Sequence, residues 1–160
     1  MEGMDRGMRR IEKALGIDKT IDILENGDFG VLATCGQDGF PYAVPLSYVC
    51  YNKMIYFHSA LEGHKIDNIS YDDNVSFCVV GKTKEIADEF DILYQSVIVF
   101  GRASIVKGKE KRRALVLIAK KYTHKSDSEI NDYLKANAKK SCVVKIKIKK
   151  ITGKGTKGLD

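Results

Sequence analysis

The sequence lacks several features that mark membrane, secreted and redox-dithiol proteins. No apolar run is long enough to cross a bilayer, and the first ten residues contain no apolar core of a signal peptide. We therefore expect a cytoplasmic protein with no membrane partner. The four cysteines are widely separated and form no Cys-x-x-Cys pair, so we expect no metal site or redox dithiol, and interpret them as small buried hydrophobes: Cys35, Cys50, Cys78 and Cys142.

Proline is scarce and no repeat or low-complexity linker is present. The 160 residues include 2 Pro, 44% hydrophobic residues and 30% charged residues, a composition typical of a globular protein and long enough for one sizeable core. We expect a single domain over residues 1–160, with residues 1–17 as a flexible N-terminal segment.

Charge is unevenly distributed along the chain. Residues 1–106 carry 10 basic and 16 acidic groups, a net charge of −6, whereas residues 107–160 carry 17 basic and 5 acidic groups, a net charge of +12. In residues 144–149 apolar and basic residues alternate, as in a strand with one buried and one solvated face. No nucleic-acid motif accompanies them, so we expect no nucleic-acid partner. A basic surface that meets an acidic partner remains an alternative.

Six β-prone runs predict strands. Gly36-Gln-Asp-Gly39 and Asn52-Lys53 are turn sequences that join the first three runs into an antiparallel meander. Pro45 cannot donate to a ladder, so its strand should be irregular there or lie on an edge, with backbone groups free for a ligand. Gly101 suggests a bulge or a bend, and the charged interval 82–91 is predicted to form a loop. The predicted strands are 29–35, 42–50, 54–58, 74–80, 94–106 and 142–151.

Four helices are predicted at the margins of these strands. Asp18 is the expected cap of a helix that ends near Asn26-Gly27, and Ser126 or Asp127 is the expected cap of residues 128–136. The other two cover residues 65–69 and 109–122. Helices at the margins of six mostly antiparallel strands predict a mainly β fold, a six-stranded β-barrel that closes to remove its exposed edges.

The segment from Met54 to Ile69 carries the clearest candidate site. Its first part has the pattern of a strand and its last part that of a helix start. Between them lie a hydroxyl, two imidazoles, a flexible glycine and an ammonium group: Ser59, His58, His64, Gly63 and Lys65. A hydroxyl and a cation at the N-terminus of a helix suit an anionic phosphate, so we predict a phosphate-binding site here. An ordinary capped turn with surface histidines would use the same residue types.

Four short motifs resemble the pyridoxamine 5′-phosphate oxidase-like flavoproteins, and most closely the nitroimidazole-resistance branch. In chain order these motifs are Gly30-Val-Leu-Ala-Thr, Pro41-Tyr-Ala-Val-Pro-Leu-Ser47, Ile55-Tyr-Phe-His-Ser-Ala-x-x-Gly-His-Lys65 and Ser96-Val-x-x-x-Gly-Arg-Ala103. The resemblance implies an FMN-binding split β-barrel that works as a homodimer, with two FMN sites at the subunit interface.

The resemblance also implies roles for matched positions. Ser59, His64 and Lys65 match the residues that hold the FMN phosphate, and His58 matches a histidine with a role near the flavin. We therefore name His58 as the candidate catalytic residue, although a structural hydrogen bond at the strand end would explain it equally well. The remaining expected cofactor contacts are Val44, Pro45, Leu46, Ser47 and Ala60, with Gln95 and Ser96 reaching the flavin from the other subunit.

The sequence departs from the family pattern at three points. His64 replaces an arginine of the phosphate site, so phosphate affinity is expected to fall as pH rises. The chain contains no tryptophan, and the Arg-x-His clamp of the true oxidases is missing, so vitamin B6 oxidation is not expected. We predict an FMN-dependent oxidoreductase for small electron-poor substrates such as nitroaromatics. The alternatives are a haem-binding or haem-degrading protein with His58 or His124 on iron, and a non-catalytic flavin-binding module.

Overall fold

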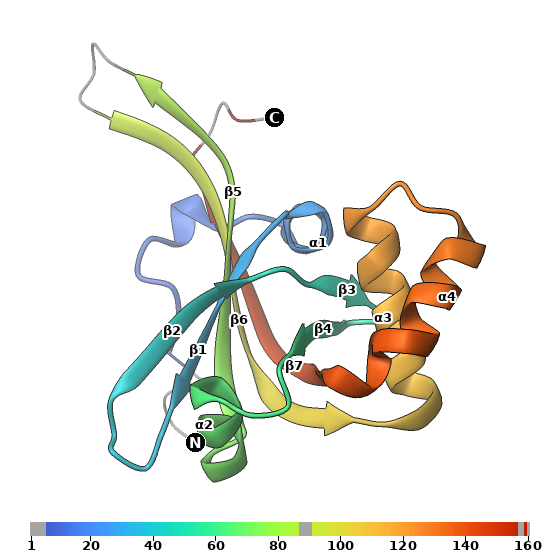
Figure 1. Cartoon of the computed structure of the whole chain (residues 1–160). Coiled ribbons are helices and arrows are strands. Elements are labelled where there is room, and N and C mark those ends of the chain that lie inside the picture. Colours follow the sequence, from blue (N-terminus) through green and yellow to red (C-terminus); the bar gives the residue numbers. More distant parts are fainter. Residues whose placement is uncertain (1–5, 87–90, 157–158, 160) are drawn as a thin grey trace.

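One antiparallel sheet forms the centre of the molecule, and helices lie around it (Figure 1). The computed structural model describes residues 6–86, 91–156 and 159. The strand order is β2-β1-β5-β6-β7-β4-β3, which confirms the predicted mainly β fold with peripheral helices. The strands are β1 (Gly30–Cys35), β2 (Pro41–Leu46), β3 (Val49–Tyr51), β4 (Met54–Ser59), β5 (Asn74–Ile86), β6 (Asp91–Val106) and β7 (Cys142–Gly155).

The sheet differs from the predicted barrel in strand number and in closure. The predicted strand 42–50 is divided into β2 and β3, so the sheet has seven strands and not six. The chain leaves the ladder at Tyr48, whose N–H and carbonyl bind the Tyr122 hydroxyl at 2.9 and 2.8 Å and not a neighbouring strand. β2 and β3 are the two edges, and no ladder joins them among the described residues, so the prediction that the barrel closes is wrong. The antiparallel sheet with its peripheral helices is consistent with the split β-barrel that the resemblance implies. The edge position expected for Pro45 is confirmed.

The β5 and β6 strands are longer than the sequence predicted. Their ladder continues through Thr83↔Tyr94 to Ile86↔Asp91, so the predicted loop over 82–91 is wrong at residues 82–86 and at Asp91, and residues 87–90 lie outside the described part. This two-stranded ribbon projects beyond the rest of the sheet (Figure 1). The predicted bulge at Gly101 is confirmed, since the register between β6 and β7 shifts between Phe100 and Gly101.

The helices follow the predicted pattern with one corrected cap. The first helix begins after Gly16, which is its N-cap, so the prediction of Asp18 as cap is wrong and Asp18 lies in the first turn. Its predicted end at Asn26 is confirmed. Ser126 caps the last helix in a capping box, which confirms the first of the two predicted caps, Ser126 or Asp127. The helices are α1 (Ile17–Asn26), α2 (His64–Tyr71), α3 (Gly108–Tyr122) and α4 (Asp127–Asn137), with short 3-10 turns η2 (Ile11–Lys13) and η4 (Ala138–Lys140).

Strand alternation divides the buried residues into two cores. The main core lies on the inner face of the sheet, where Phe57, Phe77 and Val99 are fully buried, and α1 and α2 pack against it. In the second core, α3 and α4 pack on the outer face at one end of the sheet, and Leu115 and Leu134 contact strand residues there. The second core therefore holds the two helices against the end of β4.

The rest of the outer face carries apolar side chains that stay partly exposed. Val31 on β1 and Val80 on β5 are 37% and 61% exposed, and Cys78, Ile98 and Phe100 beside them are only half-buried. Alternation along β7 is as predicted: Val144 and Ile146 are buried while Lys147 and Lys149 are exposed. Within the described residues, no helix combines the length and the apolar character needed to cross a membrane.

Candidate functional site

The structure brings Ser59 and Lys65 together at the predicted phosphate site. Ser59 is the last residue of β4 and Lys65 is the second residue of α2. The Lys65 ammonium group donates a hydrogen bond to the Ser59 Oγ at 3.2 Å. Ser59 is only 5% exposed, so its hydroxyl is held in one place beside the start of α2.

The N-terminus of α2 faces this pair because the helix is anchored to the sheet. The Asn68 amide donates to the Thr34 hydroxyl of β1 at 3.0 Å, and Ile66 and Ile69 are buried in the main core. The preceding residue, Gly63, has φ 125° and no side chain that could cap the helix. Its carbonyl accepts the N–H groups of Ile66 and Asp67, which leaves the first N–H groups of the helix directed outward.

His64 lies beside the Ser59 and Lys65 pair. Its ring packs on the Tyr42 ring of β2, with centroids 4.1 Å apart and planes inclined at 31°. This contact connects the start of α2 to the edge strand β2. The site thus lies between the end of β4, the start of α2 and the β2 edge.

The predicted β2 contacts point in different directions. Val44 and Leu46 pack against the main core, whereas Pro45 is exposed at the edge of the sheet. Ser47 follows β2 and lines a separate cavity. The side chains of Val44 and Leu46 are therefore occupied in the core.

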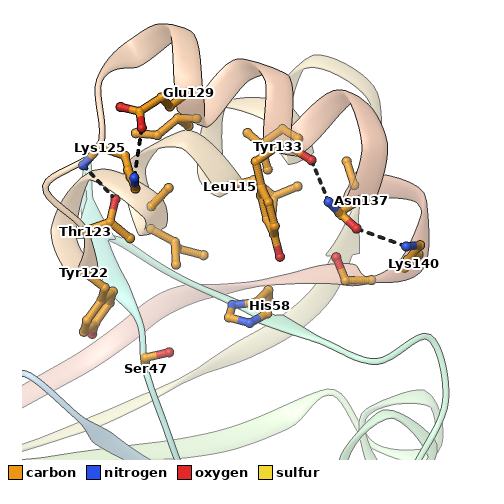
Figure 2. A pocket seen from close by; sticks show the side chains of 16 residues that line it. Ser47, His58, Leu115, Tyr122, Thr123, Lys125, Glu129, Tyr133, Asn137 and Lys140 are labelled. Carbon is orange, nitrogen blue, oxygen red and sulfur yellow. Dashed lines mark hydrogen bonds and ion pairs between the residues drawn. The ribbon is translucent and has the colours of Figure 1, made fainter.

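His58 lies on the other side of β4 from Ser59. Neighbouring residues of a strand point to opposite faces, and the exposed His58 ring faces a cavity of about 550 Å³ between α3, α4 and the strands (Figure 2). No described residue is a hydrogen-bond partner of the His58 ring, which gives no support to a structural hydrogen bond at this position. The two predicted parts of the site, phosphate contact and candidate catalytic residue, therefore face opposite sides of one strand.

Ala60, Gln95 and Ser96 occupy three different environments. The Ala60 carbonyl accepts a hydrogen bond from the Cys142 Sγ at 3.1 Å, and burial raises the pKa of that thiol. Gln95 is 3% exposed and its amide donates to the Leu159 carbonyl at 2.5 Å, whereas the half-buried Ser96 points to the outer face. The contact of Ala60 with a cofactor, and those of Gln95 and Ser96 with the cofactor of a second subunit, stay predictions.

The cavity between α3 and α4 was missed by sequence reasoning. Its lining comes mostly from the two helices, which the sequence indicated only as amphipathic segments. A local pattern encodes which helix face is apolar, but it does not encode the space left between that face and a strand. The residues that line the cavity are Ser47, His58, Leu115, Ile118, Ala119, Tyr122, Thr123, Lys125, Glu129, Ile130, Tyr133, Leu134, Asn137, Ala138, Lys140 and Ser141.

The part of the chain that the structure describes contains no candidate metal centre. No three His, Cys, Asp or Glu side chains gather there in a way that could hold an ion. Among the four free cysteines, Cys142 is buried and the other three are half-buried. Burial also raises the pKa of the Cys50 thiol to about 11, as is usual for a thiol in an apolar environment.

Comparisons with known proteins place this geometry among related folds. The family described as pyridoxamine 5′-phosphate oxidase matches residues 17–155. No curated protein matches the sequence. Similar solved structures include a conserved hypothetical protein, Rv2991, from Mycobacterium tuberculosis (TM-score 0.81, 23% identity, 96% of this chain and 94% of that chain). A candidate 5-nitroimidazole antibiotic resistance protein from Bacteroides thetaiotaomicron is also similar (TM-score 0.73, 23% identity, 89% of this chain and 86% of that chain). A third similar structure is that of a heme binding protein from Mycobacterium smegmatis (TM-score 0.68, 18% identity, 88% of this chain and 54% of that chain).

Proposed function

Because the chain belongs to the pyridoxamine 5′-phosphate oxidase family, we propose that it is an FMN-binding flavoprotein that reduces small electron-poor substrates such as nitroaromatics. The observation that carries this proposal is the contact of the Lys65 ammonium group with the Ser59 hydroxyl at the N-terminus of α2. The arrangement lies within the matched residues and is assembled by this chain alone.

The donors at this corner suit a phosphate monoester. Lys65 contributes a positive charge and Ser59 a hydroxyl, and the first N–H groups of α2 supply the partial positive charge of a helix N-terminus. His64 can add a further donor from beside Tyr42. A carboxylate at the same place would bind fewer of these donors than a phosphate with its additional oxygens.

We propose that a second copy of the chain completes the flavin site. The outer face around Val31, Val80 and Phe100 is apolar and partly exposed. Burial of such a face is worth about 25 cal/mol for each Å² of apolar surface, so a copy of the same face is a favourable partner. Ser96 lies on this face, in accord with its expected contact with the flavin of the other subunit.

The residues of the chain would position the cofactor and the substrate. Bound FMN supplies the redox chemistry, since it can accept electrons from a donor and pass them to an acceptor. Ser59 and Lys65 hold the phosphate, and the open β2 edge at Pro45 offers backbone groups to the ring system. His58 faces the cavity on the other side of β4 and is not part of this phosphate corner.

The first experiment identifies the cofactor. Purified protein should be yellow, should release FMN on denaturation and should contain FMN by mass spectrometry. Colourless protein that fails to bind added FMN would refute the proposal. Reduction of nitroaromatics with NADH or NADPH as electron donor then separates an enzyme from a flavin-binding module without turnover.

The phosphate site has a more specific test. Lys65→Met should weaken FMN binding by about 10-fold or more, since a hydrogen bond to a charged group contributes about 1.5–3 kcal/mol. Riboflavin has no phosphate, so its affinity should change little. Lys149→Met removes an exposed lysine on β7 and serves as the charge-matched control. Equal losses for FMN and riboflavin would place the phosphate elsewhere.

The proposed dimer is tested on the outer face. Val80→Glu places a charge on a side chain that is 61% exposed in one chain and should convert the dimer to a monomer in light-scattering measurements. Ile17→Glu, on a 56% exposed side chain of α1, is the control and should leave the dimer intact. Dimers in both variants would exclude this face as the interface.

Haem binding is the second candidate function. The His58 imidazole has no partner among the described residues and faces a cavity, as a ligand to haem iron would require. Titration with haemin should then give a Soret band that His58→Ala removes. If FMN binds and haemin gives no such band, this candidate is refuted.

A further inference from the structure

The cavity between α3, α4 and β4 has two kinds of lining (Figure 2). Its walls are largely apolar, with the rings of Tyr122 and Tyr133 coming from the two helices. The volume of about 550 Å³ lies within the range of about 300–1,000 Å³ that is usual for pockets that hold small organic ligands. The apolar walls and the two rings favour an occupant with a flat aromatic body.

Polar groups without partners point into the same space. Ser47 and His58 lie below the helices and face the cavity (Figure 2), and no described residue hydrogen-bonds to either side chain. A hydroxyl and an imidazole both supply donors to an anion. These two groups can therefore donate hydrogen bonds to a ligand at no cost to the existing contacts of the fold.

The charges of the lining leave one lysine without a carboxylate. Glu129 is the acidic residue of the described lining, and it is bound by the Lys125 ammonium group at 2.9 Å. The Lys140 ammonium group donates to the neutral Asn137 amide oxygen at 3.0 Å, and no described carboxylate forms an ion pair with it. The cavity therefore carries a net positive charge at the Lys140 end.

We propose that this cavity binds a small aromatic carboxylate, with the ring between α3 and α4 and the carboxylate near Lys140. A neutral aromatic would form no ion pair with Lys140, and a simple inorganic anion would leave the apolar walls without a contact. The inference does not require the proposed flavin function, because the cavity is formed within one chain. The cavity and the Ser59 and Lys65 pair lie on opposite sides of β4, so we expect carboxylate and flavin to bind together.

A displacement assay tests the proposal on the purified full chain. The fluorescent anion 1-anilinonaphthalene-8-sulfonate should bind saturably, and the chain contains no tryptophan that would interfere. 2-Naphthoate should displace the probe, whereas its uncharged methyl ester should do so about 5-fold less well, the upper range for an exposed ion pair. Equal displacement by acid and ester would overturn the proposal.

Two lysine variants show whether the charge acts locally. Lys140→Gln should weaken 2-naphthoate by about 5-fold and leave the methyl ester unchanged. Lys139→Gln removes the same charge one residue away, from a side chain outside the cavity lining, and should change neither ligand. Equal effects of the two variants would show only a long-range attraction and would overturn the assigned site.

Filling the cavity and adding FMN complete the test. Ala119→Phe should abolish displaceable probe binding while the circular dichroism spectrum is retained. If this variant does not fold, the comparison of Lys140→Gln with Lys139→Gln still tests the site. Saturating FMN should change the affinity for 2-naphthoate by less than about 2-fold, that is, by less than about 0.4 kcal/mol. Displacement of the probe by FMN would assign the cavity to the flavin and overturn the proposal. If the protein binds 2-naphthoate but not FMN, the proposed flavin function is refuted and the carboxylate site is retained.

Discussion

The Tyr122 hydroxyl holds three segments together, and Tyr122→Phe measures its contribution to stability. It accepts the Tyr48 N–H at 2.9 Å, and its own proton can be donated to the Asp28 carbonyl at 2.6 Å or the Tyr48 carbonyl at 2.8 Å. These bonds join the C-terminus of α3 to the break between β2 and β3 and to the segment after α1. Phenylalanine keeps the ring and removes all of them.

The expected loss follows from the group that is left without a partner. Tyr48 is fully buried, and an unsatisfied buried N–H costs about 1–3 kcal/mol, to which the lost donated bond adds about 1 kcal/mol. We expect the free energy of unfolding to fall by about 2–4 kcal/mol and the thermal midpoint to fall by about 5–15 °C for a chain of this length.

Urea and thermal unfolding of Tyr122→Phe, followed by circular dichroism, provide the measurement. Tyr133→Phe is the matched control, because Tyr133 is 65% exposed and its hydroxyl has no partner among the described residues. The control should change the free energy by less than about 0.5 kcal/mol. A loss below about 0.5 kcal/mol in Tyr122→Phe itself would show that water replaces these bonds and would refute the reasoning.

Three further predictions concern pH, thiol reactivity and packing. The Lys145 ammonium group holds the pKa of Glu110 below its ordinary value, so Glu110→Gln should destabilise the protein at about pH 7, and the difference from wild type should shrink as pH falls below about 4. Because burial raises the Cys50 pKa to about 11, iodoacetamide at about pH 8 should leave Cys50 unmodified in the folded protein, as judged by peptide mass spectrometry. Gly30→Ala should cost about 2 kcal/mol or more in urea unfolding, because its Cβ would lie 2.2 Å from the buried Phe77 ring.

Each of these has a control. The sign for Glu110 follows because a lowered pKa stabilises the fold above the pKa of the unfolded state, so a constant difference between about pH 7 and about pH 3 would contradict it. Cys50 must become reactive in urea, and equal labelling of folded and unfolded protein would exclude protection by burial. Gly16→Ala adds a methyl group with no atom within 4 Å. If it costs as much as Gly30→Ala, the Phe77 clash is not the cause.

The β5 and β6 strands show why the length of an element was harder to predict than its existence. The β-branched run from Val97 to Val99 indicated a strand by itself. The interval 82–86 is charged and contains few strand formers, yet residues 83–86 pair with residues 91–94 because the adjoining strands already hold the two segments in register. Cross-strand pairing outweighed local preference there.

The sequence by itself determined that a helix starts at Ser126 or Asp127, the alternation of β7 and the corner at which Ser59 precedes Lys65, since each depends on residues close together in the chain. Only the tertiary structure decided which edges stay open, which way His58 points and where a cavity remains. These features depend on contacts between distant segments, such as the Tyr122 hydroxyl on Tyr48, and on the space between α3, α4 and β4. Local periodicity specifies which side of an element is buried, whereas the shape of the gap between two elements is set by the side chains of both.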